Sequence, residues 1–202
     1  MKRVEYFYDV SSPYAYLASD EIGKLAAAHG AEVIWRPYFL GGLFKQLQAE
    51  IVPFTSGSPQ KRDILKKDMF RWAEVRGLPF NWPTTFPMMT IRPMRVLVQL
   101  DGEMQVAVAR HLFRAYWAHD ENIGDPLVLH QLLESQGLDA DVLLAGCERP
   151  EVKQKLLDAT NEALARGACG APTFFVGHHL VWGQDRLDFV GRLLDGWQPK
   201  HG

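Results

Sequence analysis

Strand-like sequence occurs near the two ends of this chain, and that placement limits what the chain can fold into. Residues 4–9 and 32–38 are rich in β-branched and aromatic side chains, as are residues 171–176 and 179–182. Helical periodicity between the first two runs favours a parallel pair of strands with a right-handed crossover, and residues 177–178 suit a tight hairpin turn. The sequence therefore predicts an α/β protein in which a β-α-β half and a β-β-α half close one sheet, with helices inserted between them.

The turn after the first strand carries the strongest local signal. Ser12 precedes Pro13, the usual order of an N-cap and a first helical residue, and Gly30 is a suitable C-cap for the helix that follows. A hydroxyl at a helix N-terminus, beside free backbone N–H groups, stabilises an anion. The plainer interpretation, which these residues alone favour, is that Ser12 only caps its helix.

The middle of the chain is predicted to be mainly helical. Residues 39–45 break the strand pattern, and residues 46–58 are irregular. Ser58 and Pro59 repeat the N-cap signal, and Gly77 ends the helix that they start. Further helices are predicted near residues 93–100, 103–119, 126–136, 139–147 and 151–166, and a last one starts at residues 184–187.

Residues 78–89 form a proline-rich connection that carries Phe80, Trp82 and Phe86. These aromatic side chains can wall an apolar pocket, or they can pack against one another along an extended connection. The sequence leaves both interpretations open.

Composition argues against several classes of function. A chain of 202 residues can bury a sizeable core, and its net charge of −2 gives no reason to expect nucleic acid or an anionic membrane as a partner. The first residues are too charged for a signal peptide, and no apolar run is long enough to span a bilayer. We therefore expect a cytoplasmic protein.

The cysteines and the paired histidines predict no site. Cys147 and Cys169 are far from the spacing of a Cys-x-x-Cys motif, and we expect Cys169 to be a buried small residue. His178 and His179 point to opposite faces of the predicted hairpin, which makes a poor metal site. We expect no metal.

Three motifs, in order along the chain, resemble those of a known family. They read FYDVSSPYAYL at residues 7–17, GAPTF at residues 170–174 and WGQDRL at residues 182–187. The chain resembles the 2-hydroxychromene-2-carboxylate isomerases and the related kappa-class glutathione transferases. The resemblance implies a thioredoxin-like fold with a large all-helical insertion between its two halves, as in the disulfide oxidoreductase DsbA. The implied boundaries are 1–44 and 168–202 for the thioredoxin-like domain and 45–167 for the inserted helical domain.

The resemblance gives Ser12 a second role. In this family the Ser of Ser-Pro-Tyr stands where thiol–disulfide enzymes carry the first Cys of Cys-x-x-Cys, and its hydroxyl faces the sulfur of glutathione. A hydroxyl donor at a helix N-terminus favours the thiolate, which is the reactive form of a thiol. Glutathione is thus the implied cofactor and Ser12 the implied catalytic residue. Ser11 lies one position too early for the motif, so we interpret it as a loop or capping hydroxyl.

The resemblance also implies that a cis peptide bond precedes Pro172. Such a bond would present the N–H and C=O of Ala171 to the cysteinyl part of glutathione, as an added strand would. The alternative is a trans proline that starts an edge strand.

The segment from Trp182 through Gly183 and Gln184 to Asp185 matches the part of the family that holds the γ-glutamyl end of glutathione. Asp185 would accept the α-ammonium, and Gln184 would lie near the α-carboxylate. The alternative for Asp185 is an acid in the first turn of the last helix.

Two residues are implied on the substrate side. Lys45 matches a position where family isomerases have a lysine, and Tyr14 completes the Ser-Pro-Tyr motif. Lys45 would pair with a carboxylate of the substrate or of glutathione, unless it is a solvated surface lysine. The asparagine that many family members carry after the second strand has no counterpart in residues 48–53.

The implied activity is a glutathione-dependent isomerisation. The thiolate would add reversibly to an aromatic keto acid or its hemiketal, so glutathione would be regenerated, and the protein would be a homodimer. The alternatives are a kappa-like transferase, which consumes glutathione, and a thioredoxin-fold binding module without turnover.

Overall fold

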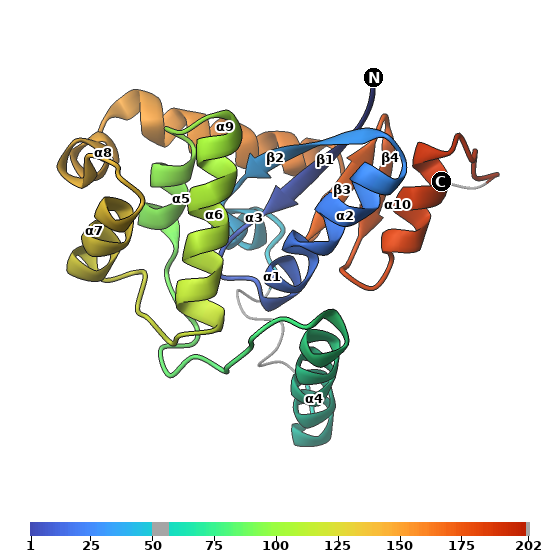
Figure 1. Ribbon diagram of the computed structural model, residues 1–202, viewed down its shortest axis with the longest axis horizontal. Coiled ribbons are helices and arrows are strands. Elements are labelled where there is room, and N and C mark those ends of the chain that lie inside the picture. The colour runs from blue at the N-terminus through green and yellow to red at the C-terminus, as the bar shows by residue number, and fades with distance from the viewer. Residues whose placement is uncertain (50–56, 201–202) are drawn as a thin grey trace.

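The computed structural model describes residues 1–49 and 57–200 and is built around one four-stranded sheet (Figure 1). The strands are β1 (Lys2–Tyr8), β2 (Ala31–Pro37), β3 (Thr173–Val176) and β4 (His179–Trp182). Their order is β2-β1-β3-β4; β1 runs parallel to β2 and antiparallel to β3, and β3 and β4 form the expected hairpin. The strands from the N-terminal part of the chain are therefore joined to those from the C-terminal part by the pairing of β1 with β3.

Side chains of β1 alternate between the two faces of the sheet. Tyr6 and Tyr8 share one face, where the rings of Tyr6 and Phe174 stack with centroids 5.4 Å apart. Glu5 and Phe7 share the other face. Because Tyr6, Phe7 and Tyr8 are all fully buried, the sheet has a packed core on both sides.

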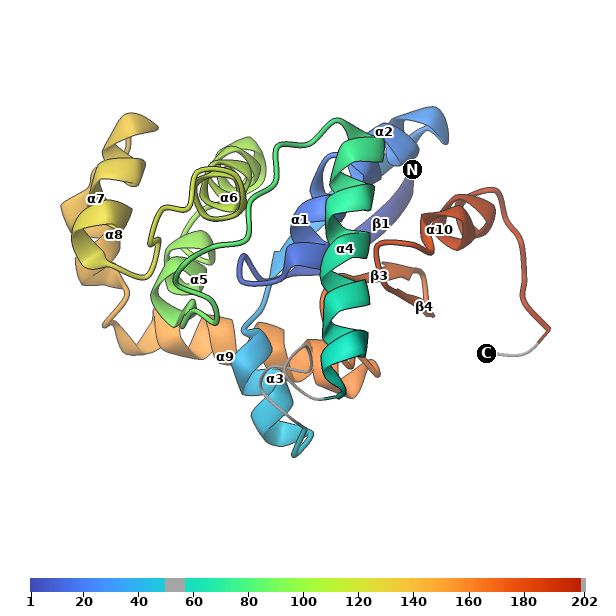
Figure 2. The ribbon, with the colours of Figure 1, turned by 90° about the horizontal axis from the view of Figure 1, so that it is seen from below.

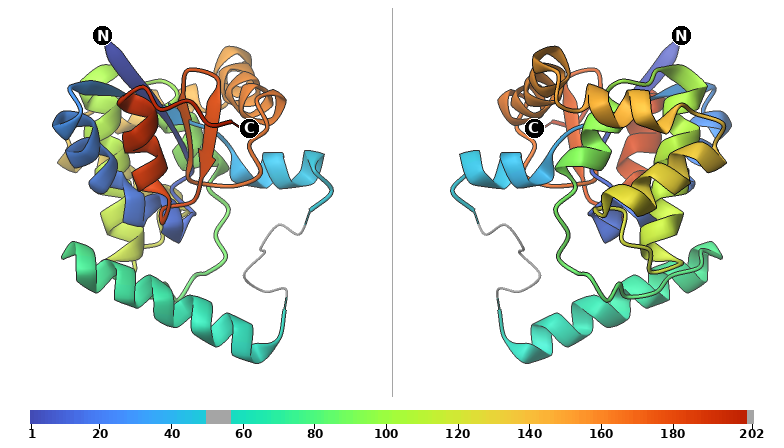
Figure 3. Two further views of the ribbon diagram at one scale, coloured as in Figure 1. Left: turned by 90° about the vertical axis from the view of Figure 1, so that its right-hand side faces the viewer. Right: turned by 90° about the vertical axis from the view of Figure 1, so that its left-hand side faces the viewer.

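Helices cover both faces (Figure 3). The expected single helix after β1 is in fact two helices that meet at Asp20, a residue type that disfavours helix interiors. The Asp20 carboxylate turns instead toward Arg110 and Arg114, at 3.5 and 3.8 Å. One face carries α1 (Pro13–Ser19), α2 (Glu21–Ala28) and α10 (Leu187–Leu194), and the other carries α9 (Pro150–Ala165).

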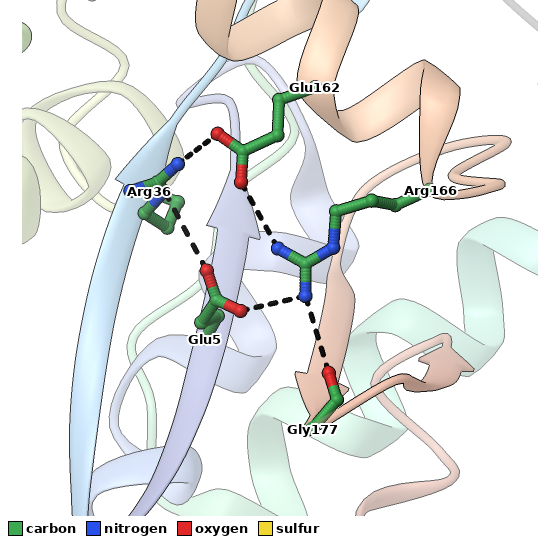
Figure 4. Close-up of polar contacts among 5 residues, drawn as sticks. All are labelled: Glu5, Arg36, Glu162, Arg166 and Gly177. Atoms are coloured by element: carbon green, nitrogen blue, oxygen red, sulfur yellow. Dashed lines mark hydrogen bonds and ion pairs between the residues drawn. The ribbon is translucent and has the colours of Figure 1, made fainter.

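Alternating charges tie α9 to the sheet (Figure 4). Arg166, at the end of α9, donates to Glu5 of β1 at 2.7 Å and to Glu162 at 3.1 Å. Arg36 of β2 pairs with Glu162 and lies 3.9 Å from Glu5. The Arg166 guanidinium also lies 3.7 Å from the ring centroid of Phe175. This network links α9 to three adjacent strands.

Residues 39–45, which were expected only to break the strand pattern, form most of a short helix. Its first N–H, on Leu40, donates to the Asp9 carboxylate at 2.9 Å, so the residue that caps it is 31 positions away in the sequence. This helix crosses the expected domain boundary after residue 44; both boundaries stay predictions.

Residues 50–56, within the stretch expected to be irregular, lie outside the described residues. The helices of this region are α3 (Leu40–Gln46), α4 (Pro59–Arg76), α5 (Ile91–Leu97), α6 (Gly102–Trp117), α7 (Pro126–Ser135) and α8 (Ala140–Gly146).

α4 begins and ends where the sequence predicts. Ser58 accepts a hydrogen bond from a first-turn N–H, and Gly77 ends the helix with φ of 64°. Met69 and Ala73 pack on Leu17 of α1, so α4 lies beside α1 (Figure 2). Within the described residues, no helix has the length and apolarity needed to cross a membrane.

The aromatic connection at residues 78–89 packs against itself and the body of the protein. The rings of Phe80 and Trp117 stack with centroids 5.7 Å apart, and those of Trp82 and Phe86 lie 4.8 Å apart. Packing of aromatic side chains of this connection on one another is thus observed, and a role as the wall of a pocket stays a prediction.

Candidate functional site

Ser12 lies at the N-terminus of α1, directly beyond the end of β1. Its Oγ accepts the backbone N–H of Ala15 at 3.2 Å, which confirms the predicted N-cap. Its hydroxyl also donates to the Ala171 carbonyl at 3.0 Å, across 159 positions of sequence. The side chain is 4% exposed. The hydroxyl is therefore both a helix cap and a bridge to the loop before β3.

Asp9 organises the turn in front of Ser12. Its carboxylate accepts hydrogen bonds from the Ser11 N–H and hydroxyl, both at 2.9 Å, and from the Thr90 hydroxyl at 2.7 Å, in addition to the Leu40 N–H. Burial raises the pKa of Asp9, and these hydrogen bonds act in the opposite direction. The expectation that Ser11 is a loop hydroxyl is confirmed. Asp9 lies within the first of the three motifs, where no role was predicted for it; its further signal is that an acid directly follows a buried strand.

The loop before β3 has the predicted cis peptide bond between Ala171 and Pro172. The Pro172 carbonyl accepts the Gly183 N–H at 3.1 Å, which fixes the loop after β4 against the loop before β3. Gly183 has φ of 106°, and a Cβ on it would lie 2.7 Å from the Asp185 carboxylate, so this position needs glycine. Trp182 lies over Gly170, where an added Cβ would be 2.9 Å from the indole nitrogen.

Gln184 and Asp185 differ in exposure. Asp185 precedes α10, whose N-cap is Arg186 and whose first-turn acid is Asp188, so Asp185 is not the first-turn acid of the last helix. Its side chain is 48% exposed and lies 3.4 Å from the Arg186 guanidinium. Gln184 is 3% exposed, and its Oε1 has no hydrogen-bond partner. An unpartnered buried acceptor is costly unless a ligand supplies a donor.

Arg76, the last residue of α4, completes a chain of hydrogen bonds around these residues. Its guanidinium donates to the Gln184 carbonyl at 2.8 Å and to the Leu17 carbonyl of α1 at 2.7 Å. Ser12 of the same α1 helix bonds to Ala171, whose neighbour Pro172 bonds to Gly183. In the sequence, Arg76 is marked only by its place directly before Gly77, which ends the helix.

A cleft of about 520 Å³ opens beside this chain of hydrogen bonds, between α2, α4 and the start of α10. It offers the acceptors of Gln184 and Asp185 and the guanidinium of Arg76. Donors and acceptors on one wall fit the ammonium and carboxylate of an amino-acid group, which is the form of the γ-glutamyl end of glutathione. The lining residues are Glu21, Lys24, Trp72, Val75, Arg76, Gln184, Asp185, Leu187 and Asp188.

The two predicted substrate residues, Tyr14 and Lys45, differ in burial and in position relative to the cleft. Tyr14, in the first turn of α1, is half-buried; burial raises its pKa, as do the nearby carboxylates of Asp185 and Asp68. Tyr14 packs against the cluster of Leu17, Met69 and Ala73, between α1 and α4. Lys45 is exposed in the last turn of α3, and it does not line this cleft.

Cys169 is exposed, so the prediction of a buried small residue is wrong. It lies in the irregular loop before Pro172, where the backbone does not follow the alternation of a strand. Cys147 is the buried cysteine, and both thiols are free. In the part of the chain that the structure describes, no three His, Cys, Asp or Glu side chains gather as metal ligands.

Comparison with known proteins agrees with this architecture. The model of the DSBA-like thioredoxin domain family matches residues 3–195. A 2-hydroxychromene-2-carboxylate isomerase of Sphingobium xenophagum is 27% identical over 199 residues, covering 96% of this chain and 98% of that protein. A kappa 2 glutathione transferase of Caenorhabditis elegans is 30% identical over 208 residues, covering 96% of this chain and 92% of that protein.

A solved structure of a 2-hydroxychromene-2-carboxylate isomerase superposes with a TM-score of 0.82 at 24% identity, covering 96% of this chain and 95% of that one. This confirms the predicted thioredoxin-like fold with its helical insertion. The family match spans both halves of the sheet and the helices between them. The chain belongs to the DSBA-like thioredoxin domain family and, within it, to the group formed by the 2-hydroxychromene-2-carboxylate isomerases and the kappa-class glutathione transferases.

Proposed function

We propose that this protein is a glutathione-dependent isomerase of the 2-hydroxychromene-2-carboxylate isomerase type. The observation that carries the proposal is the bond from Ser12 at the N-terminus of α1 to Ala171 at the cis-proline loop. This pair puts a hydroxyl, in place of a redox cysteine, beside the backbone that would hold a peptide thiol. The isomerase relatives support this reading of the reaction.

In this proposal glutathione lies along the loop before β3. The backbone of Ala171 pairs with its cysteinyl part, and Gln184 and Asp185 hold its γ-glutamyl end in the cleft. Trp182 and Gly183 shape that end of the site through the contacts described above. Lys45 and Tyr14 are proposed on the side of the aromatic substrate.

Ser12 is the proposed catalytic residue because it stabilises negative charge. A thiol with an ordinary pKa of about 8.5 is mostly protonated at neutral pH. The Ser12 hydroxyl and the N-terminus of α1 both favour the charged form, which lowers that pKa. Glutathione, when bound, would supply the thiolate that adds reversibly to the conjugated substrate and leaves after bond rotation.

The second candidate is a glutathione transferase. It is favoured by the 30% identity with the kappa 2 transferase, which is above that with the isomerases. The two candidates share the same site and differ in whether glutathione is consumed.

One assay separates them. 2-Hydroxychromene-2-carboxylate is supplied in large excess over glutathione, and both isomer formation and free thiol are followed. Isomerisation of many equivalents of substrate per glutathione, with an unchanged thiol titre, is the expected result. Thiol loss with an aromatic halide electrophile, and no isomerisation, would make the protein a transferase. Binding of glutathione without either reaction would make it a binding module and overturn the proposal.

We also propose that the protein acts in the cytoplasm as a homodimer. The exposed, unpaired thiol of Cys169 suits a reducing compartment. The dimer rests on the family resemblance, and light scattering after gel filtration tests it. The substrate remains a small aromatic molecule, with neither nucleic acid nor a membrane as a partner.

A further inference from the structure

Arg76 is held in one orientation by three contacts. Two of them are the hydrogen bonds to the carbonyls of Leu17 and Gln184. In the third, its guanidinium lies 4.7 Å from the ring centroid of Trp72, one turn earlier on α4. A planar guanidinium carries five N–H donors, so three remain after the two carbonyls are served. Arg76 also lines the cleft, and a guanidinium fixed in this way is pre-organised for a ligand.

The charge of Arg76 is not balanced by a direct partner. Across residues 1–49 and 57–200, no ion pair joins Arg76 to a carboxylate. The other cation of the cleft, Lys24, is already paired with Glu21 at 2.6 Å. Burial lowers the pKa of Arg76, while Glu21 and Asp185 nearby raise it, and an arginine so placed stays charged at neutral pH. The half-buried cation of this cleft is thus available to an anion.

We propose that Arg76 binds the α-carboxylate of the γ-glutamyl group of glutathione. This inference rests on the proposed function and adds a residue to its site. Beside Arg76, which is bonded to the Gln184 backbone, the unpartnered Oε1 of Gln184 and the carboxylate of Asp185 accept the α-ammonium. The cleft then selects peptide thiols that end in a free amino-acid group, and a peptide thiol without that carboxylate binds poorly.

The test is a binding cycle measured by isothermal titration calorimetry. The ligands are glutathione and 4-aminobutanoyl-cysteinyl-glycine, which differs only in lacking the α-carboxylate. The proteins are wild type, Arg76→Met and Arg76→Gln; the glutamine keeps a donor for one carbonyl but has no charge. Arg71→Met is the matched control, because Arg71 lies on the exposed side of the same helix and is paired with Asp68 at 2.7 Å.

Wild type is expected to bind glutathione about tenfold or more tightly than the decarboxylated peptide, as a charge-assisted hydrogen bond predicts. Arg76→Met and Arg76→Gln should lose about the same factor for glutathione and almost nothing for the decarboxylated peptide. Arg71→Met should bind both ligands as wild type does.

Other results would overturn the inference. Equal affinity of wild type for the two ligands would do so without any variant. Equal losses for both ligands in the Arg76 variants would mean that Arg76 only positions the loop at Gln184. If wild type binds neither ligand, the proposed function fails together with the inference, whereas the first two results leave the proposed function intact.

Discussion

Replacing Ser12 by alanine removes two hydrogen bonds at once. The Ala15 N–H loses its cap, which costs about 1 kcal/mol, and the buried Ala171 carbonyl loses its donor, which costs a further ~1–2 kcal/mol. The free energy of unfolding of the unliganded protein should therefore fall by about 2–3 kcal/mol. For a chain of 202 residues, this lowers Tm by roughly 4–12 °C. This loss is expected whether or not Ser12 is catalytic.

The pKa of the bound thiol is the quantity that tests catalysis. If Ser12 stabilises the thiolate, Ser12→Ala should raise the pKa of bound glutathione by one to two units, each worth about 1.4 kcal/mol. The thiolate fraction at neutral pH then falls by a factor of about 10 to 100, and turnover falls with it and recovers as the pH is raised. Ultraviolet absorbance of the thiolate, titrated in complexes with wild type and variant, measures the shift.

Ser58 provides a matched control because it caps α4 in the same way. Its side chain accepts the Lys61 N–H at 3.2 Å and is followed by Pro59, as Ser12 is followed by Pro13. Ser58→Ala should cost about 1 kcal/mol of stability and leave the thiol pKa unchanged. A Ser12→Ala complex whose thiol titrates at the same pH as that of wild type would refute the catalytic role and leave Ser12 as a cap.

Three further results are expected. With Ser12 in place of a redox cysteine, the protein should not reduce insulin disulfides in a turbidity assay; a rate near that of thioredoxin would contradict the site. Glutathione at a hundredfold excess over its dissociation constant should stabilise the fold by about 2.7 kcal/mol, measured as a rise in Tm. Asp185→Ala should remove most of this rise in Tm without destabilising the free protein, because Asp185 is half exposed. Burial raises the pKa of Asp9, so the contribution of Asp9 to the free energy of unfolding is largest below pH about 4, its ordinary pKa. This contribution decreases as the pH rises through the raised pKa. Urea unfolding of wild type and Asp9→Asn at a series of pH values should show the decrease in wild type only.

Local signals predicted the elements whose ends are determined by neighbouring residues. Ser12-Pro13 and Ser58-Pro59 start helices because the cap and the first-turn proline act within three residues of each other. The hairpin turn at Gly177, with φ of 61°, is a short-range feature of the same kind. These are the parts of the fold for which a sequence pattern is sufficient.

Elements stabilised by distant residues were not predictable in this way. α3 begins because Asp9 accepts the Leu40 N–H, and nothing near Leu40 in the sequence signals that contact. The start of α10 is delayed to Leu187 because residues 183–186 first turn back, with the Arg186 N–H bonded to the Gly183 carbonyl at 3.4 Å. The same delay places Asp185 outside the helix and beside the cleft.

The residues of the candidate site also differ in whether a local sequence motif marks them. Ser12, Pro172 and Asp185 belong to the motifs from which the sequence predicts a site, whereas Arg76 lies outside those motifs. Its two hydrogen bonds reach Leu17 and Gln184, which are 59 and 108 positions away. The helix α4 thus places a charged group beside the candidate site, and this contact is visible only in the folded chain.

The bond from Ser12 to Ala171 places a condition on the proposed chemistry. A serine hydroxyl has one proton, and here it is donated to the Ala171 carbonyl at 3.0 Å. To donate to a thiolate, the hydroxyl must turn away from a buried carbonyl, which costs about 1–3 kcal/mol unless another donor replaces it. A peptide bound alongside Ala171, as an added strand, would supply that donor through its own N–H. When the N–H of the bound peptide donates to the Ala171 carbonyl, the Ser12 hydroxyl is free to donate to the sulfur of the same peptide. A thiol carried on a peptide should therefore bind as the thiolate more readily than a simple thiol of the same acidity.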